Sequence, residues 1–286
     1  MAMSMSATKL PGGLQRAAAI GRDVPCRFCQ VRGKAFCGFA DSGDLSLLEG
    51  VRSYREYRAG DTIVRAGARI GFVGTLVAGT ALVSARTQRG SRRIAGLLFP
   101  ADGFGHPEGA RAAPHAIEAA TDVVVCSIPH RDLQAMAVSL PRVTGRLLAA
   151  AKKEREGAQR WSAGLDTLSV RARLAHLILT VARSQNPLAG IGAFPDLSPS
   201  QGFPDRIYLP LSRGAVADYL GVSREAAARQ FDRLVADGLV ALEQRRQLRI
   251  LDPERLRQAA LGREFRGDFG DQRLPAARAH RYAGCA

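Results

Sequence analysis

The segment 213–234 constrains the fold most, because its spacing fits two short helices joined by a tight turn. Ser212 and Ser223 stand at the expected helix starts, where a serine side chain caps free backbone N–H groups. Gly221 lies between the helices, where the turn needs a positive φ that glycine adopts without strain. The segment therefore predicts a helix–turn–helix pair whose second helix ends at the Asp237-Gly238 step.

The residues after this pair predict a small sheet and a last helix. The stretches 239–243 and 248–251 have the composition of a β-hairpin, and Asp252-Pro253 opens a helix because proline suits its first position. Such a unit can place its second helix in the major groove of DNA, where the first two turns reach the base edges. The candidate DNA-binding residues are Arg213, Ser223, Arg224, Glu225, Ala228 and Arg229.

Between 54 and 128, short apolar stretches alternate with glycines. The expected strands are 62–64, 71–77, 80–85, 93–99 and 123–128. Turn signals that recur about every eight to twelve residues are typical of an all-β roll or sandwich. A β-roll is therefore predicted as a second folded unit, ahead of the helix–turn–helix.

The segment 140–168 has apolar or small residues at a spacing of three to four positions. This spacing predicts one long helix, and a helix of that length is typical of a dimer interface. The stripe comprises Leu140, Thr144, Leu147, Ala151, Glu154, Ala158, Trp161 and Leu165. A helix packed on its own roll is the alternative. A further helix is expected at 170–184, and a proline-rich surface loop at 184–206.

The five cysteines are not expected to form a disulfide framework, because no export signal is recognisable. Cys26, Cys29 and Cys37 form a C-x2-C-x7-C group, and Cys126 lies in an apolar strand far along the chain. Four thiolates suit a 4Fe–4S cluster or structural zinc, and the softness of sulfur alone does not decide between them. One close pair with two distant cysteines favours the iron–sulfur cluster, while a thiol switch or no metal are alternatives. Cys285 is expected to be a spare thiol.

Charge and hydropathy exclude other classes of protein. The balance of 41 Lys and Arg against 26 Asp and Glu gives a net charge of +15, which favours a polyanionic partner such as nucleic acid. No apolar run reaches the roughly 18 residues of a membrane span and no signal peptide is recognisable, so a cytoplasmic protein is expected. The roll offers no clustered His and Glu and no nucleophile beside a base, so no enzyme activity is expected.

Four features together resemble the Crp/Fnr family of bacterial transcription regulators. They are the roll segment YRAGDTIVRAGARIGFVGTLVAGTALVSA, the segment LLFPADGFG, the long central helix and the segment SRGAVADYLGVSREAAARQFDRLVADGLV. The resemblance implies an α+β fold with an N-terminal cyclic-nucleotide-binding-like β-roll, a long central dimerisation helix and a C-terminal winged helix-turn-helix. The implied organisation is a flexible tail 1–22, a cysteine-loop and β-roll sensor domain 23–139, a dimerisation helix 140–168, a DNA-binding domain 169–260 and a flexible tail 261–286.

Within the family, the cysteine pattern resembles the oxygen-sensing Fnr branch, which implies that Cys26, Cys29, Cys37 and Cys126 ligate a 4Fe–4S cluster. The resemblance further implies a homodimer that binds palindromic TTGA-like half-sites in double-stranded DNA and contacts RNA polymerase to regulate low-oxygen genes. The E-x-x-S-R signature of the branch stands here as E-A-A-A-R. Because Ala228 replaces the serine, the resemblance does not determine which bases are preferred at the outer positions of the half-site. A regulator that responds to nitric oxide or thiol redox state without a cluster is the alternative.

The catabolite-activator branch of the family binds a cyclic nucleotide through a glutamate and an arginine of the roll. Here His106-Pro107 stands where that branch has its glutamate, and Pro114-His115-Ala116 replaces its arginine-serine step. A cyclic phosphodiester would find no fixed guanidinium, since Arg111 is a weak substitute. The sequence therefore predicts that this roll binds no cyclic nucleotide.

Overall fold

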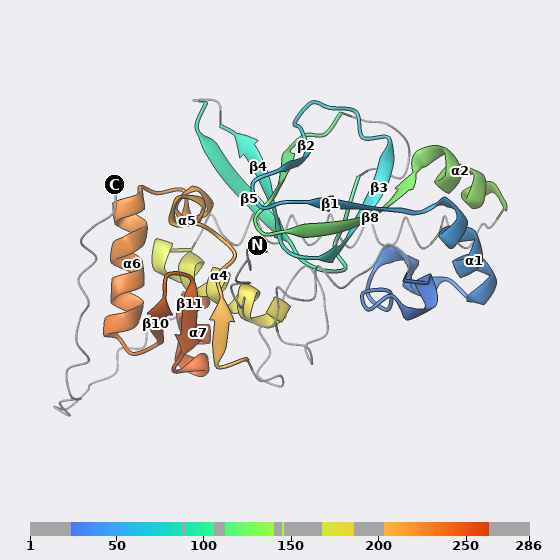
Figure 1. Ribbon diagram of the computed structural model, residues 1–286. Coiled ribbons are helices and arrows are strands. Elements are labelled where there is room, and N and C mark those ends of the chain that lie inside the picture. The colour runs from blue at the N-terminus through green and yellow to red at the C-terminus, as the bar shows by residue number, and fades with distance from the viewer. Residues whose placement is uncertain are drawn as a thin grey trace, which may run out of the picture.

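The computed structural model describes residues 24–87, 90–105, 112–139, 145, 168–185 and 203–262. These residues form a cysteine-bearing loop, a β-roll and a C-terminal unit of helices with a small sheet (Figure 1). The expected α+β class is confirmed, with the strands of the roll first and the helix–turn–helix last. Among the helices of the described residues, none is both long and apolar enough to cross a membrane.

The β-roll consists of two four-stranded sheets whose neighbouring strands are antiparallel. One sheet has the order β1-β8-β3-β6 and the other the order β2-β7-β4-β5. Their inward side chains enclose an apolar core that includes the fully buried Leu76 and Val125. The strands are β1 (Ser53–Tyr57), β2 (Thr62–Val64), β3 (Phe72–Ala78), β4 (Ala81–Arg86), β5 (Arg92–Leu98), β6 (Gly103–Phe104), β7 (Ala116–Ala119) and β8 (Val123–Pro129).

The five expected strands are confirmed as β2, β3, β4, β5 and β8, each to within one residue at either end. Strands β1, β6 and β7 were not expected from the sequence. β1 carries charged residues and is largely exposed, so it has no apolar run to mark it. β6 and β7 are short, and only their pairing with β3 and with β2 and β4 defines them as strands.

The cysteine loop precedes the roll and ends in a capped helix that the sequence analysis did not recognise. Asp41 caps this helix because its Oδ1 accepts a hydrogen bond from the Asp44 N–H at 3.0 Å. Leu45 and Leu48 are buried in one apolar cluster with Ile128 of β8, so the helix fastens the loop to the roll. The elements of this segment are η1 (Cys26–Phe28), η2 (Phe36–Phe39) and α1 (Ser42–Val51).

Helix α2 (His130–Ser139) follows β8, and α1 and α2 lie together at the end of the roll that is farther from the C-terminal unit (Figure 1). Helical structure therefore begins at His130, ahead of the segment 140–168 that is expected to form the dimerisation helix. All eight residues of the expected dimer stripe, from Leu140 to Leu165, lie outside the described residues. The dimerisation helix thus stays a prediction.

The C-terminal unit packs its helices on a three-stranded sheet with the order β10-β11-β9. The expected hairpin is confirmed as β10 and β11, and the last helix starts at Pro253 with Asp252 as its N-cap. The loop expected at 184–206 is shorter at both described ends, because α4 continues to Gln185 and Arg206 already pairs with β11. The elements are α4 (Val170–Gln185), β9 (Arg206–Tyr208), α5 (Arg213–Leu220), α6 (Arg224–Ala236), β10 (Val240–Gln244), β11 (Gln247–Ile250) and α7 (Pro253–Ala260).

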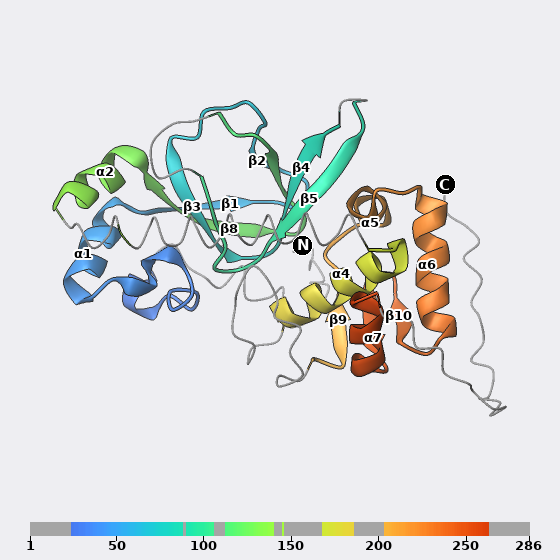
Figure 2. The same cartoon turned by 180° about the vertical axis from the view of Figure 1, so that it is seen from behind.

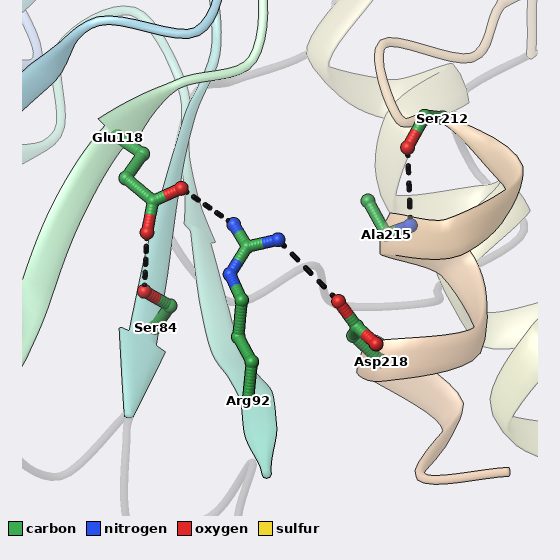
Figure 3. Close-up of polar contacts among 6 residues, drawn as sticks. All are labelled: Ser84, Arg92, Glu118, Ser212, Ala215 and Asp218. Carbon is green, nitrogen blue, oxygen red and sulfur yellow. Dashed lines mark hydrogen bonds and ion pairs between the residues drawn. The ribbon is translucent and has the colours of Figure 1, made fainter. Parts of the chain in front are cut away.

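The C-terminal unit lies directly against the roll, with α5 beside β5 (Figure 2). Ile94 of β5 belongs to the same apolar core as α4 and α5. Beside this core, Arg92 pairs with Glu118 at 2.6 Å and with Asp218 of α5 at 3.4 Å, while Ser84 donates to Glu118 at 2.8 Å (Figure 3). One arginine therefore links the roll to the first helix of the helix–turn–helix.

Candidate functional site

The helix–turn–helix is formed by α5 and α6, and both expected caps are confirmed. Ser212 Oγ accepts a hydrogen bond from the Ala215 N–H, and Ser223 Oγ from the Ala226 N–H, each at 3.1 Å. Gly221 ends α5 with φ +68° and ψ +36°, the left-handed conformation that closes many helices. Local sequence signals therefore end one helix and start the next within three residues.

Helix α6 presents the predicted DNA-binding residues to solvent. Arg224, Glu225 and Arg229 are exposed on its first two turns, and Ala228 is partly exposed. Ala227 is buried in the core of the unit, which fixes the orientation of the helix. The side chains that could reach base edges therefore share the outer surface of the second helix.

The electrostatics of this surface suit nucleic acid. The pKa of Glu225 lies below its ordinary value, first because its own backbone N–H donates to it and then because the Ser223 hydroxyl does. An ionised Glu225 can accept from a cytosine amine, and an arginine can pair with guanine. Arg213 is exposed at the first turn of α5, a position suited to a phosphate contact.

The cysteine cluster, defined as Cys26, Cys29, Cys37 and Cys126, is brought together on the outer face of the sheet that contains β8. Cys29, Cys37 and Cys126 pack against one apolar cluster, and Cys26 and Cys37 belong to the next. Cys37 and Cys126 each lie close enough to the other cysteines to interact with them electrostatically. Within the described residues, no three His, Cys, Asp or Glu side chains are arranged as a metal site. The four sulfurs are therefore neighbours but not a closed ligand set.

Burial determines the protonation of these thiols. It raises the pKa of Cys37 and of Cys126 to about 12 each, and the neighbouring cysteines add to both shifts. Burial also raises the pKa of Cys26, against the charge of Arg52 and a hydrogen bond from its side chain. At neutral pH the metal-free thiols of Cys26, Cys37 and Cys126 are thus protonated, so a metal group must displace their protons to bind.

Three residues that the sequence analysis did not single out lie beside the cysteine cluster. Arg52 donates through Nη2 to the Val24 carbonyl at 2.8 Å, and its guanidinium lies 4.6 Å from the centre of the Tyr54 ring. Tyr54 of β1 and Thr75 of β3 are the cross-strand partners of Cys126 on its two sides. Only the register of the strands places these residues there, and the sequence analysis did not recognise β1.

The predicted lack of a cyclic-nucleotide site falls partly outside the described residues, since His106, Pro107 and Arg111 lie beyond them. Pro114 and His115 are described, and both are exposed. The absence of a cyclic nucleotide therefore stays a prediction.

Comparisons with known proteins identify both folded units. Residues 54–139 match the family model of the cyclic nucleotide-binding domain, and residues 172–259 match that of the Crp-like helix-turn-helix domain. The chain is 34% identical over 250 residues to the transcriptional activator protein FnrL of Cereibacter sphaeroides, across 87% of this chain and 95% of the relative. It is 22% identical over 233 residues to the fumarate and nitrate reduction regulatory protein of Salmonella typhimurium, across 80% of this chain and 88% of the relative.

A solved structure supports the fold. FixK2 from Bradyrhizobium japonicum is similar with a TM-score of 0.61 and 23% identity, across 73% of this chain and 97% of that chain. The roll, the winged unit and the relative at 34% identity over most of both chains agree with one another. The chain therefore belongs to the Crp/Fnr family of DNA-binding transcription regulators, and within it to the Fnr-like members.

Proposed function

We propose that this protein is an iron–sulfur, oxygen-responsive transcription regulator that binds palindromic DNA as a homodimer. The observation that carries the proposal is that Cys126, from the middle of the roll, packs on the same apolar cluster as Cys29 and Cys37 of the loop. Four thiols in apolar surroundings have the donor chemistry of a 4Fe–4S site. The relatives FnrL and the fumarate and nitrate reduction regulatory protein are named as a transcriptional activator and a regulatory protein, which supports the regulatory part of the proposal.

The cysteine cluster is well placed to influence dimerisation. Cys26 and Cys37 would hold the group from the loop, and both belong to the apolar cluster that includes Leu133 and Met136 of α2. The expected dimerisation helix follows α2 directly in the sequence. When bound, a 4Fe–4S group supplies the oxygen-sensitive redox chemistry. A change in the position of the loop when the group binds would then reach α2 through these packed side chains.

The test is the metal content of protein purified without air. We expect roughly four iron and four acid-labile sulfide ions per chain, with visible absorbance that is lost in air. Cys126→Ser should contain neither iron nor sulfide, because the roll then contributes no thiolate. Cys285→Ser is the matched control and should retain them. A wild-type chain without iron and sulfide after anaerobic purification would overturn the proposal.

The outer surface of α6 is proposed to read the bases. Replacing Arg229 with alanine should cost about 1–3 kcal/mol of binding to a duplex with two TTGA-like half-sites, because a bidentate contact to guanine is lost. Fluorescence anisotropy of anaerobic protein on labelled duplexes measures this loss. The affinity of the variant for a scrambled duplex of equal length should fall much less.

The matched control for this variant is Arg233→Ala, since Arg233 is exposed one turn later on the same helix. A charge at this position should act on matched and scrambled duplexes alike. If Arg229→Ala also weakens both duplexes equally, Arg229 contacts phosphate rather than a base. The same binding curves at two salt concentrations separate the two roles.

A thiol-redox or nitric-oxide regulator without a cluster is the second candidate. It is favoured by the finding that the described residues do not form a ready metal-ligand group. The two candidates give opposite results in the iron and sulfide measurement. DNA binding that responds to a thiol oxidant in iron-free protein would support the second.

A further inference from the structure

Two buried hydrogen-bond donors beside the cysteine cluster have no partner in the described residues. They are the Nε of Arg52 and the Oγ1 of Thr75. Thr75 is only 3% exposed, so water does not replace the missing partner. Unpaired buried donors destabilise a fold, and native proteins retain few of them without another reason. Both donors therefore indicate an acceptor that occupies this face of the roll when the protein is in its working state.

Thr75 flanks the cysteine cluster from β3. It is the cross-strand partner of Cys126, and such partners point to the same face of a sheet. Val77, two residues further along β3, packs in the same apolar cluster as Cys126. Thr75 therefore lies beside apolar side chains and the cysteines on this face of the sheet. The Cys126 sulfur is the potential acceptor that the register places beside this hydroxyl.

Arg52 flanks the cysteine cluster from the opposite side of β8. It directly precedes β1, and its guanidinium stacks on Tyr54, the β1 partner of Cys126. The hydrogen bond from its Nη2 to the Val24 carbonyl ties the same side chain to the start of the cysteine loop. One cation therefore lies between the loop cysteines and the strand cysteine.

We propose that Arg52 and Thr75 are positioning residues for the metal group held by the four cysteines, donating hydrogen bonds to its sulfur atoms from the two sides of β8. This inference rests on the function proposed above. Four thiolates around an iron–sulfur core carry net negative charge. Donors and a nearby cation offset that charge, which raises the reduction potential and strengthens metal binding.

The first test is the midpoint potential of the anaerobically loaded protein, measured by mediated titration. Arg52→Gln and Thr75→Val should each shift the potential to a more negative value, because the first removes the positive charge and the Nε donor and the second removes the hydroxyl with little change in shape. Thr75→Ser keeps the hydroxyl and should have the wild-type potential. Arg55→Gln is the matched control, since Arg55 lies on β1 over the Phe72 ring. Unchanged potentials in Arg52→Gln and Thr75→Val at full iron and sulfide content would overturn the inference.

The second test uses cobalt(II) alone as the probe of the four thiolates in the cluster-free chain. Arg52→Gln and Thr75→Val should each weaken cobalt binding by about 10-fold or more in competition with a chelator. Affinities equal to wild type would overturn the inference. If the wild-type chain carries no iron and sulfide, the proposed function fails and the cobalt arm decides this inference by itself. Thermal unfolding separates misfolding from lost donors, since Thr75→Val should unfold no earlier than wild type.

Discussion

Replacing Gly79 with alanine is expected to lower the free energy of unfolding by about 2–5 kcal/mol. Gly79 joins β3 to β4 with φ +83°, and a Cβ there would lie 2.1 Å from the Asp122 carbonyl oxygen. The turn cannot easily yield, because Thr80 N–H donates to Thr121 Oγ1 at 2.9 Å. The strain of positive φ and a backbone clash therefore add. Urea unfolding followed by circular dichroism measures the loss.

The matched control is Gly67→Ala. Gly67 has nearly the same φ of +79°, but no atom lies within 4 Å of the position of its added Cβ. Only the conformational cost of about 1–2 kcal/mol is expected there. Equal losses in the two variants would show that the backbone around Asp122 relaxes without cost, contrary to the prediction.

Replacing Asp102 with asparagine is expected to stabilise the protein above pH 6 and to have little effect near pH 4. Asp102 precedes β6 and is buried, and burial raises the pKa of its carboxyl to about 6, although a hydrogen bond from the Phe99 N–H at 2.8 Å opposes the shift. The unfolded carboxyl has its ordinary pKa of about 3.9. The folded chain thus binds this proton more tightly, and the group's contribution to stability is lost as the pH rises from about 4 to 6.

A shift of about two units corresponds to about 3 kcal/mol, which is the largest gain expected for Asp102→Asn at pH 7. Urea unfolding of both proteins between pH 4 and pH 8 tests this, since the other titrating groups cancel in the difference. Asp102→Ala is the control, because it also removes the acceptor of the Phe99 N–H and should lose about 1–3 kcal/mol of that gain. A difference between Asp102→Asn and wild type that does not change with pH would contradict the prediction.

Elements with local signals could be predicted from the sequence. The Ser212 and Ser223 caps and the glycine between them define the helix–turn–helix wherever the rest of the chain goes. Helix α1 was missed although its signal is equally local, since Asp41 and Asp44 form a reciprocal cap. Strand β1 was missed for a different reason, because its exposed, charged sequence identifies it only through its pairing with β8.

The candidate cysteine site could likewise be predicted only in part from the sequence. The four cysteines are visible in the sequence because their chemistry is rare and specific, and the structure gathers all of them on one face of the roll. Arg52, Tyr54 and Thr75 are common residue types at unremarkable spacings. Nothing in their own segments marks them, so no reading of the sequence alone would have selected them.

The sequence by itself determined the two folded units, their local caps and turns, and the set of sulfur donors. The tertiary structure alone decided that Arg52 and Thr75 flank Cys126, and that Arg92 joins Glu118 of the roll to Asp218 of α5. The physical reason is that these pairings depend on strand register and on the packing of units distant in the chain. Register is set by the burial of a whole sheet face, and a slip of one residue would turn every side chain of a strand to the other face.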